Sequence, residues 1–135
     1  MAFEDFQKLM TLYDVYGEDF GKMGFICHEG GVGKHMYLIL DGKVTIYKNS
    51  PPPKQKRIDI AQMGPGDFFG ELSLFEGVNF NATVQALTHV KTLVIDMNVL
   101  KEIVMTNPKF AIALIKRFSN RVRNCQSYFG EFLQV

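Results

Sequence analysis

The feature that most constrains the fold is the alternation of short apolar runs with turn signals over residues 15–95. The apolar runs include MYLIL, KVTIY, RIDIAQM, ATVQAL and KTLVID. Segments rich in glycine or proline separate them, among them EGGVGK, DGK, NSPPPKQ, GPGD and EGVN. Many short strands joined by tight turns are typical of an antiparallel barrel or jelly roll, and not of alternating strands and helices.

Two of the turn segments predict specific connections. Asp41-Gly42 lies between two apolar runs and predicts a tight hairpin. The segment NSPPPKQKR is polar and contains prolines, so it predicts an exposed loop between two strands.

Helical patterns flank the strand-rich region on both sides. Apolar residues recur at helical spacing over residues 3–13, which predicts a short amphipathic helix. The segment DMNVLKEIVMTN predicts a second short helix, with Asp96 or Asn98 as its N-cap. Asn107-Pro108 offers a cap followed by a proline at the first helical position, so a further helix is expected to begin there.

The last predicted helix carries an apolar seam in which gaps of four and three residues alternate. Its members are Ala111, Ile115, Phe118, Val122, Cys125, Phe129 and Phe132. A period of about 3.5 residues held over about three heptads favours a partner helix, and we expect a parallel homodimer through residues 107–135. A helix packed on its own domain also has an apolar face, and a different chain is another partner.

Length and charge limit the number of domains and the kinds of partner that the chain is expected to have. The 135 residues fit a single domain, divided into an N-terminal helix (1–14), a strand-rich body (15–95) and C-terminal helices (96–135). The formal net charge of +1 gives no electrostatic argument for nucleic acid or an anionic membrane. No run of about 18 apolar residues and no secretion signal occur, so we expect a cytoplasmic protein.

No complete catalytic motif is found. The segment EGGVGKH, residues 29–35, lacks the first glycine of a P-loop and the hydroxyl residue that should follow its lysine. Ser73 lacks the Gly-x-Ser-x-Gly elbow of a nucleophilic serine. The sequence therefore predicts a domain that is not an enzyme.

Metal-binding spacing is also missing. His28 and His35 are seven residues apart without a helical spacing, and Cys27 and Cys125 match no CxxC motif. We expect free thiols, no metal ligands and no cofactor. A haem or metal sensor using His28, His35 or Cys125 is kept as the last of the alternatives.

The segment GDFFGELSLFEGVNFNATV, residues 66–84, has the features of a cradle for an anion. It is expected to enter one short helical turn near Gly70, where free backbone N–H groups form a phosphate nest. Glu71 would then accept a hydrogen bond from a sugar hydroxyl, and Ser73 and Thr83 would add hydroxyl groups. The alternative is that the Gly-Glu pair only shapes a surface turn.

With these motifs the chain resembles the cyclic nucleotide-binding domain of catabolite activator-type bacterial regulators and protein kinase A regulatory subunits. GFICHEGGVGKHMYLILDGKVTIY is similar to the first hairpins of that family, and MGPGDFFGELSLFEG to the start of its phosphate-binding cassette. NPKFAIALIKRFSNRVR resembles the long helix through which the bacterial regulators dimerise. The resemblance covers nearly the whole chain and implies a β-roll with flanking helices.

The resemblance also implies a binding site in which one residue departs from the family pattern. The cyclic phosphate would lie on N–H groups near Gly70, and the ribose 2′-hydroxyl on Glu71. The arginine that pairs with the phosphate in the family falls at Phe80, and the base contacts fall at Cys125 and Gln126, of which Gln126 could still bond a purine edge. The implied ligand-binding residues are Gly70, Glu71, Leu72, Ser73, Phe80, Asn81, Ala82, Thr83 and Gln126.

The function expected from the sequence is a non-catalytic sensor domain in signal transduction or transcription regulation. It would bind cAMP or cGMP in residues 70–83 and relay binding through the helices after Asp96. Loss of the arginine would weaken binding by about 1.5–3 kcal/mol, which is about one to two powers of ten. The alternative is the same fold with an aromatic or apolar effector, or with no ligand, acting as a dimerisation module.

The chain ends at Val135, where the bacterial regulators would begin a helix-turn-helix domain. We expect no DNA-binding domain within these 135 residues. Either such a domain belongs to a longer protein of which this sequence is a part, or the protein is a single-domain member of the family.

Overall fold

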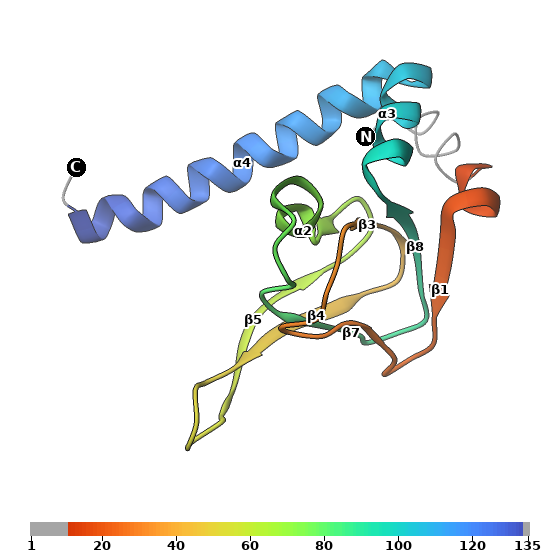
Figure 1. Cartoon of the computed structure of the whole chain (residues 1–135). Coiled ribbons are helices and arrows are strands. Elements are labelled where there is room, and N and C mark those ends of the chain that lie inside the picture. Colours follow the sequence, from red (N-terminus) through yellow and green to blue (C-terminus); the bar gives the residue numbers. More distant parts are fainter. Residues whose placement is uncertain (1–10, 134–135) are drawn as a thin grey trace.

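The computed structural model describes the backbone of residues 11–133 and the side chains of residues 11–120. Its body consists of two four-stranded antiparallel sheets (Figure 1). The first sheet has the order β1 (Gly17–Phe20), β8 (Val90–Ile95), β3 (Met36–Asp41), β6 (Phe68–Phe69). The second has the order β2 (Phe25–Cys27), β7 (Thr83–Ala86), β4 (Val44–Asn49), β5 (Arg57–Met63). The predicted class, a jelly roll with flanking helices, is confirmed.

Two apolar clusters hold these layers together, and β3 contributes to both of them. Successive side chains of a strand point to opposite faces. Met36, Leu38 and Leu40 enter the cluster beneath the helices, whereas Tyr37 and Ile39 enter the cluster between the sheets. All five are buried, which explains why the run MYLIL has no polar alternation.

The hairpin predicted at Asp41-Gly42 is wrong, because β3 and β4 belong to different sheets. The turn is a corner that carries the chain across, with Gly42 at φ 92° and its N–H donating to the Asp41 carboxylate at 2.9 Å. A Cβ on Gly42 would lie 2.2 Å from the carbonyl oxygen of His89. Lys43 donates its N–H to the Thr88 hydroxyl at 3.1 Å, so this corner is tied to the one that precedes β8.

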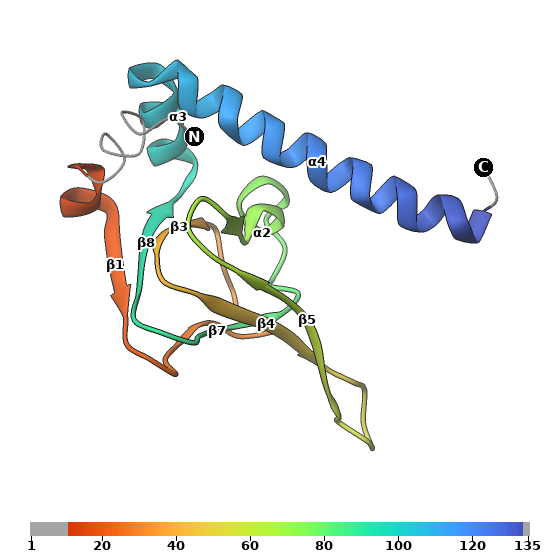
Figure 2. The ribbon, with the colours of Figure 1, turned by 180° about the vertical axis from the view of Figure 1, so that it is seen from behind.

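The loop predicted at NSPPPKQKR is confirmed. β4 and β5 pair in antiparallel register from Val44↔Met63 to Asn49↔Arg57, and residues 51–56 between them are exposed. This hairpin extends away from the body in both views (Figure 2). Strand β5 forms an edge of the second sheet.

The helices begin where the sequence predicts. Helix α3 (Met97–Thr106) is capped by Asp96, whose side chain accepts a hydrogen bond from the Val99 N–H at 2.8 Å. Helix α4 (Pro108–Leu133) begins at the proline. It passes over the short helix α2 (Glu71–Glu76) and continues beyond the sheets. Residues 11–16 are helical, and the rest of the predicted N-terminal helix lies outside the described residues.

Within the described part of the chain, no helix combines the length and the apolar character that crossing a membrane requires.

We predict that Ile103→Ala lowers the free energy of unfolding by about 2–5 kcal/mol, because it leaves a cavity beneath α3. Ile103 is 1% exposed in the cluster beneath the helices, whereas Ile58 on β5 is 52% exposed. The matched control Ile58→Ala should change stability by about 0.5 kcal/mol or less. Urea unfolding followed by circular dichroism measures both, and equal losses in the two variants would contradict this packing.

Candidate functional site

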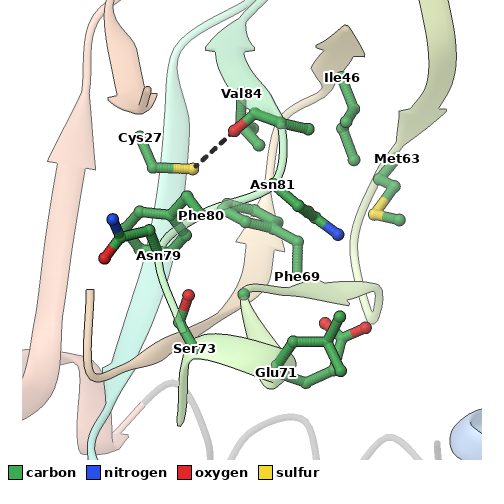
Figure 3. A pocket seen from close by; sticks show the side chains of 13 residues that line it. Cys27, Ile46, Met63, Phe69, Glu71, Ser73, Asn79, Phe80, Asn81 and Val84 are labelled. Carbon is green, nitrogen blue, oxygen red and sulfur yellow. Dashed lines mark hydrogen bonds between the residues drawn. The ribbon is translucent and has the colours of Figure 1, made fainter. Parts of the chain in front are cut away.

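The candidate site is a cavity of about 160 Å³ between α2 and the sheets. Glu71 and Ser73 lie at the end formed by α2, and Ile46, Met63 and Val84 lie at the opposite end (Figure 3). The residues that line it are Cys27, Ile46, Met63, Phe69, Gly70, Glu71, Leu72, Ser73, Asn79, Phe80, Asn81, Ala82 and Val84.

Gly70 joins β6 to α2 and sets the position of the helix. It has φ 82°, and a Cβ there would lie 3.0 Å from the carbonyl oxygen of His35. Glycine meets both the left-handed conformation and the close approach. Helix α2 begins at the next residue, as predicted, so its first turn (Glu71, Leu72, Ser73) lines the cavity.

The opposite wall is a segment whose backbone is fixed by the loop before β3. Phe80 donates its N–H to the Gly31 carbonyl at 2.9 Å and accepts from the Gly30 N–H at 2.7 Å. These two hydrogen bonds place Phe80, Asn81 and Ala82 along the cavity before β7 begins at Thr83.

The Phe80 side chain is buried against glycines. A Cβ on Gly33 would lie 2.2 Å from the tip of the Phe80 ring, and one on Gly70 would lie 3.2 Å from its edge. Gly33 is buried and has an ordinary φ, so the ring occupies the space that a side chain would fill. The position that carries arginine in the family pattern is therefore part of the apolar wall.

The lining contains no cation among the described residues. Its ionisable side chains are the Glu71 carboxyl and the Cys27 thiol. The loop residue Arg57 is held elsewhere, since its guanidinium lies 3.9 Å from the Tyr47 ring centroid and 2.8 Å from the Asp59 carboxylate. A phosphate in this cavity would thus rely on backbone N–H groups and on neutral side chains.

Burial keeps the Cys27 thiol neutral. It raises the pKa of Cys27 to about 11, because the thiolate would lose its hydration. The thiol points toward the Ala82 carbonyl oxygen, with sulfur and oxygen 4.0 Å apart. Cys27 therefore contributes a soft, uncharged surface to the cavity.

Two residues of the predicted set are not among the described lining residues. The Thr83 hydroxyl is buried and accepts a hydrogen bond from the Glu29 N–H at 3.0 Å, so it holds the loop before β3. Gln126 belongs to α4, and its side chain lies outside the described residues. A ligand contact by Gln126 stays a prediction.

Six lining residues were missed by sequence reasoning: Cys27, Ile46, Met63, Phe69, Asn79 and Val84. They come from β2, β4, β5, β6, the segment before β7, and β7 itself. Phe69, Asn79 and Val84 fall inside the segment 66–84, and no local pattern marks the other three. The pairing of β2, β4, β5 and β7 brings those three to the cavity.

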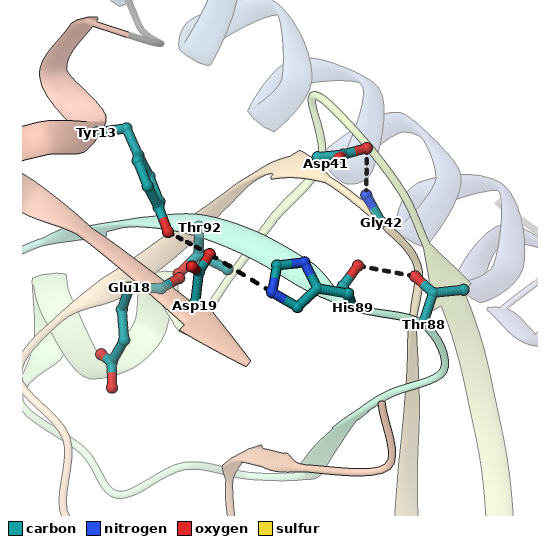
Figure 4. Close-up of polar contacts among 8 residues, drawn as sticks. All are labelled: Tyr13, Glu18, Asp19, Asp41, Gly42, Thr88, His89 and Thr92. Carbon is teal, nitrogen blue, oxygen red and sulfur yellow. Dashed lines mark hydrogen bonds and ion pairs between the residues drawn. The ribbon is translucent and has the colours of Figure 1, made fainter. Parts of the chain in front are cut away.

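The three histidines lie in separate surroundings. His28 lies against Phe25, with ring centroids 4.8 Å apart, and His35 against Tyr37 at 5.9 Å. His89 lies 3.9 Å from Asp19, which also accepts the Tyr13 hydroxyl (Figure 4). Among the described residues, no three His, Cys, Asp or Glu side chains are grouped so that they could hold a metal ion.

Helix α4 contacts the elements that carry the cavity. The Phe118 ring lies 5.9 Å from that of Phe75 on α2 and 4.9 Å from that of Phe68 on β6. Arg117 pairs with Asp67 at 2.5 Å, in the turn just before β6. The seam residue Phe118 thus packs on its own domain, whereas the seam residue Ile115 is 65% exposed.

Comparison with known proteins gives one family and several relatives. The model of the family "Cyclic nucleotide-binding domain" matches residues 18–107. A CRP-like cAMP-activated global transcriptional regulator of Mycobacterium tuberculosis is 27% identical over 115 residues, which cover 85% of this chain and 50% of the regulator. A cAMP-dependent protein kinase regulatory subunit of Schizosaccharomyces pombe is 37% identical over 71 residues, covering 53% of this chain and 16% of the subunit.

A solved structure of a regulator domain is also similar to this chain. The N-terminal domain of a transcriptional regulator from Streptomyces coelicolor is 28% identical, with a TM-score of 0.67, and the match covers 95% of this chain and 86% of that one. The chain spans about half the length of the curated bacterial regulators that it matches.

We predict that Gly33→Ala destabilises the protein by about 1–3 kcal/mol, because its methyl group would overlap the Phe80 ring. In a Phe80→Ala background the same substitution should cost much less, giving a coupling energy of about 1 kcal/mol or more. Gly21→Ala is the matched control, since a Cβ there meets nothing within 4 Å. Urea unfolding of the wild type, the two single variants and the double variant measures the coupling. An equal cost of Gly33→Ala in both backgrounds would show that Gly33 and Phe80 are not coupled.

Proposed function

Because the chain belongs to the cyclic nucleotide-binding domain family, we propose that it is a non-catalytic regulatory domain that senses a small molecule in the cavity beside α2. The resemblance found in the sequence motifs is confirmed at the level of the family. The proposal rests on one observation: α2 lines the cavity with its first turn and contacts α4 with Phe75.

This arrangement supports a relay from the cavity to α4. A ligand that touches Glu71, Leu72 or Ser73 acts on a helix of a turn and a half, and any displacement of α2 moves the Phe75 ring against Phe118. The ion pair of Asp67 with Arg117 links α4 to the turn before β6, the strand that precedes α2. A ligand shifts such an equilibrium only through its different affinity for two arrangements of α2 and α4.

The two curated relatives described above carry cAMP in their names, which makes cAMP or cGMP the first compounds to test. The cavity supports that ligand through Gly70 and the first turn of α2, but Phe80 removes the charge partner of the phosphate. Binding of a cyclic nucleotide by the wild-type chain should therefore be weaker than binding by a variant with arginine at position 80.

Exposed apolar residues on α4 support a second copy of the chain as the partner. Ile112 and Ile115 are 55% and 65% exposed on adjacent positions of the helix surface, after the buried anchor Phe110. Burying them against an equivalent helix would use Ile115 of the predicted seam and add Ile112 beside it. In a dimer through α4, a displacement of α2 and α4 in one chain would also act on α4 of the other chain.

We predict that Phe80→Arg raises the affinity for cAMP by about 10- to 100-fold, since a bidentate arginine–phosphate pair contributes about 1.5–3 kcal/mol. Calorimetric titration of cAMP and cGMP into wild type and variant measures the change. Phe80→Leu is the matched control, because it removes the ring without adding a charge. Equal affinities of wild type and Phe80→Arg would show that the phosphate is not bound beside position 80.

We predict that Ile115→Lys converts a homodimer to a monomer, because the lysine charge would be buried in the helix pair. Sedimentation velocity over a range of protein concentrations measures the change in mass. Ile58→Lys serves as the control, since Ile58 is 52% exposed on β5, far from α4 in the chain. A wild-type monomer, or an Ile115→Lys variant that remains dimeric, would overturn the α4 interface.

A further inference from the structure

We infer that the cavity takes an uncharged aromatic molecule of about one ring, carrying a hydroxyl or amide group, in preference to an anionic nucleotide. The inference rests on the proposed function, in which this cavity is the effector site. Three observations carry it: the size of the cavity, its ring-lined wall, and its charge.

The size of the cavity suits a single ring. Its volume is about 160 Å³. An apolar cavity of about 150 Å³ in another protein binds one benzene, whereas sites for drug-sized ligands measure about 300–1,000 Å³. A nucleotide, with two fused rings, a sugar and a phosphate, is larger than this volume and would extend beyond it.

The wall is aromatic and rigid. Phe69 and Phe80 both line the cavity, and Tyr37 stacks behind Phe69 with centroids 5.2 Å apart and planes at 18°. Phe80 cannot withdraw easily, because its backbone is bonded to Gly30 and Gly31 and its ring fills the space beside Gly33. Rings that are held in place offer face and edge contacts to an aromatic ligand at little cost in conformational entropy.

The charge of the lining disfavours an anion. Burying an anion without a cation costs free energy, and the described lining contains no cation. The polar groups that remain are Ser73, Asn79 and Asn81, which bond hydroxyl and amide groups of either polarity. Ile46, Met63 and Val84 form the apolar end of the cavity, and they would contact the aromatic ring of the ligand.

The test compares two probes that share a ring and differ in charge, benzyl alcohol and benzoate, together with cAMP. Each is titrated into the full wild-type chain, and NMR follows the methyl signals of Ile46 and Val84 and the amide signals of Arg117 and Phe118. We expect saturable methyl shifts with benzyl alcohol, with a dissociation constant on the order of 1 mM for so small a ligand. Binding of benzoate and of cAMP should be at least about tenfold weaker.

Two variants test where benzyl alcohol binds and why an uncharged ligand is preferred. Ala82→Leu fills the cavity and should abolish the shifts caused by benzyl alcohol, whereas Ala61→Leu, at an exposed site on β5, should preserve them. Phe80→Arg should reverse the preference, so that benzoate binds more tightly than benzyl alcohol. The amide spectrum of each variant shows whether it is folded, and Ala82→Leu alone is sufficient if Phe80→Arg does not fold.

The outcomes separate this inference from the proposed function. Tighter binding of benzoate or cAMP than of benzyl alcohol by wild type overturns the inference, and it leaves the sensor role standing if the α4 amides also shift. Benzyl alcohol binding without any shift at Arg117 or Phe118 supports the ligand class and overturns the relay. If no probe shifts the cavity methyl signals, or if Ala82→Leu leaves the shifts unchanged, the inference is overturned.

Discussion

Strand β3 is buried on both faces, and the rest of the molecule depends on that constraint. Its side chains alternate between the cluster beneath the helices and the cluster between the sheets. Neither cluster is complete without it, because the helices need an apolar sheet to cover and the second sheet needs an apolar face to close on. The short strand β6 repeats the pattern, with Phe68 in the first cluster and Phe69 in the second. The cavity borders the second cluster, and α4 lies on the first.

The adjacent residues Phe68 and Phe69 therefore connect the two functions proposed for the domain. Phe69 lines the cavity, and Phe68 contacts Phe118 on α4. The exposed ion pair of Arg117 with Asp67 is worth little by itself, as is usual at a protein surface. The ion pair instead positions α4 relative to β6, because Asp67 also accepts a hydrogen bond from the Gly64 N–H and so fixes the turn that leads into β6. A change at the cavity wall would thus reach α4 through Phe68 and Phe75.

The family pattern and the chemistry of this cavity differ at one position. The resemblance implies an arginine at position 80, and the described lining of the cavity contains no cation. In this chain the position of the arginine carries a phenylalanine, and Gly33 leaves room for its ring. Phe80 and Gly33 therefore make this part of the wall apolar.

The sequence by itself determined the elements whose causes are local. Alternating apolar runs and turns gave the strand-rich class, and the caps at Asp96 and Pro108 fixed where α3 and α4 begin. The Gly-Glu turn placed α2, because a left-handed glycine and a helix start are both properties of adjacent residues. The glycine-containing cassette was also sufficient to identify the family.

Only the tertiary structure decided which strands pair and what surrounds each site residue. Extended runs on either side of Asp41-Gly42 look the same whether the chain returns to pair or crosses to the other sheet. Thr83 looks like a ligand hydroxyl in sequence, yet its partner is the Glu29 N–H, 54 residues away. The size of the cavity and the absence of a cation from its described lining are set by residues from five strands, one short helix and a loop, whose contacts no local pattern records.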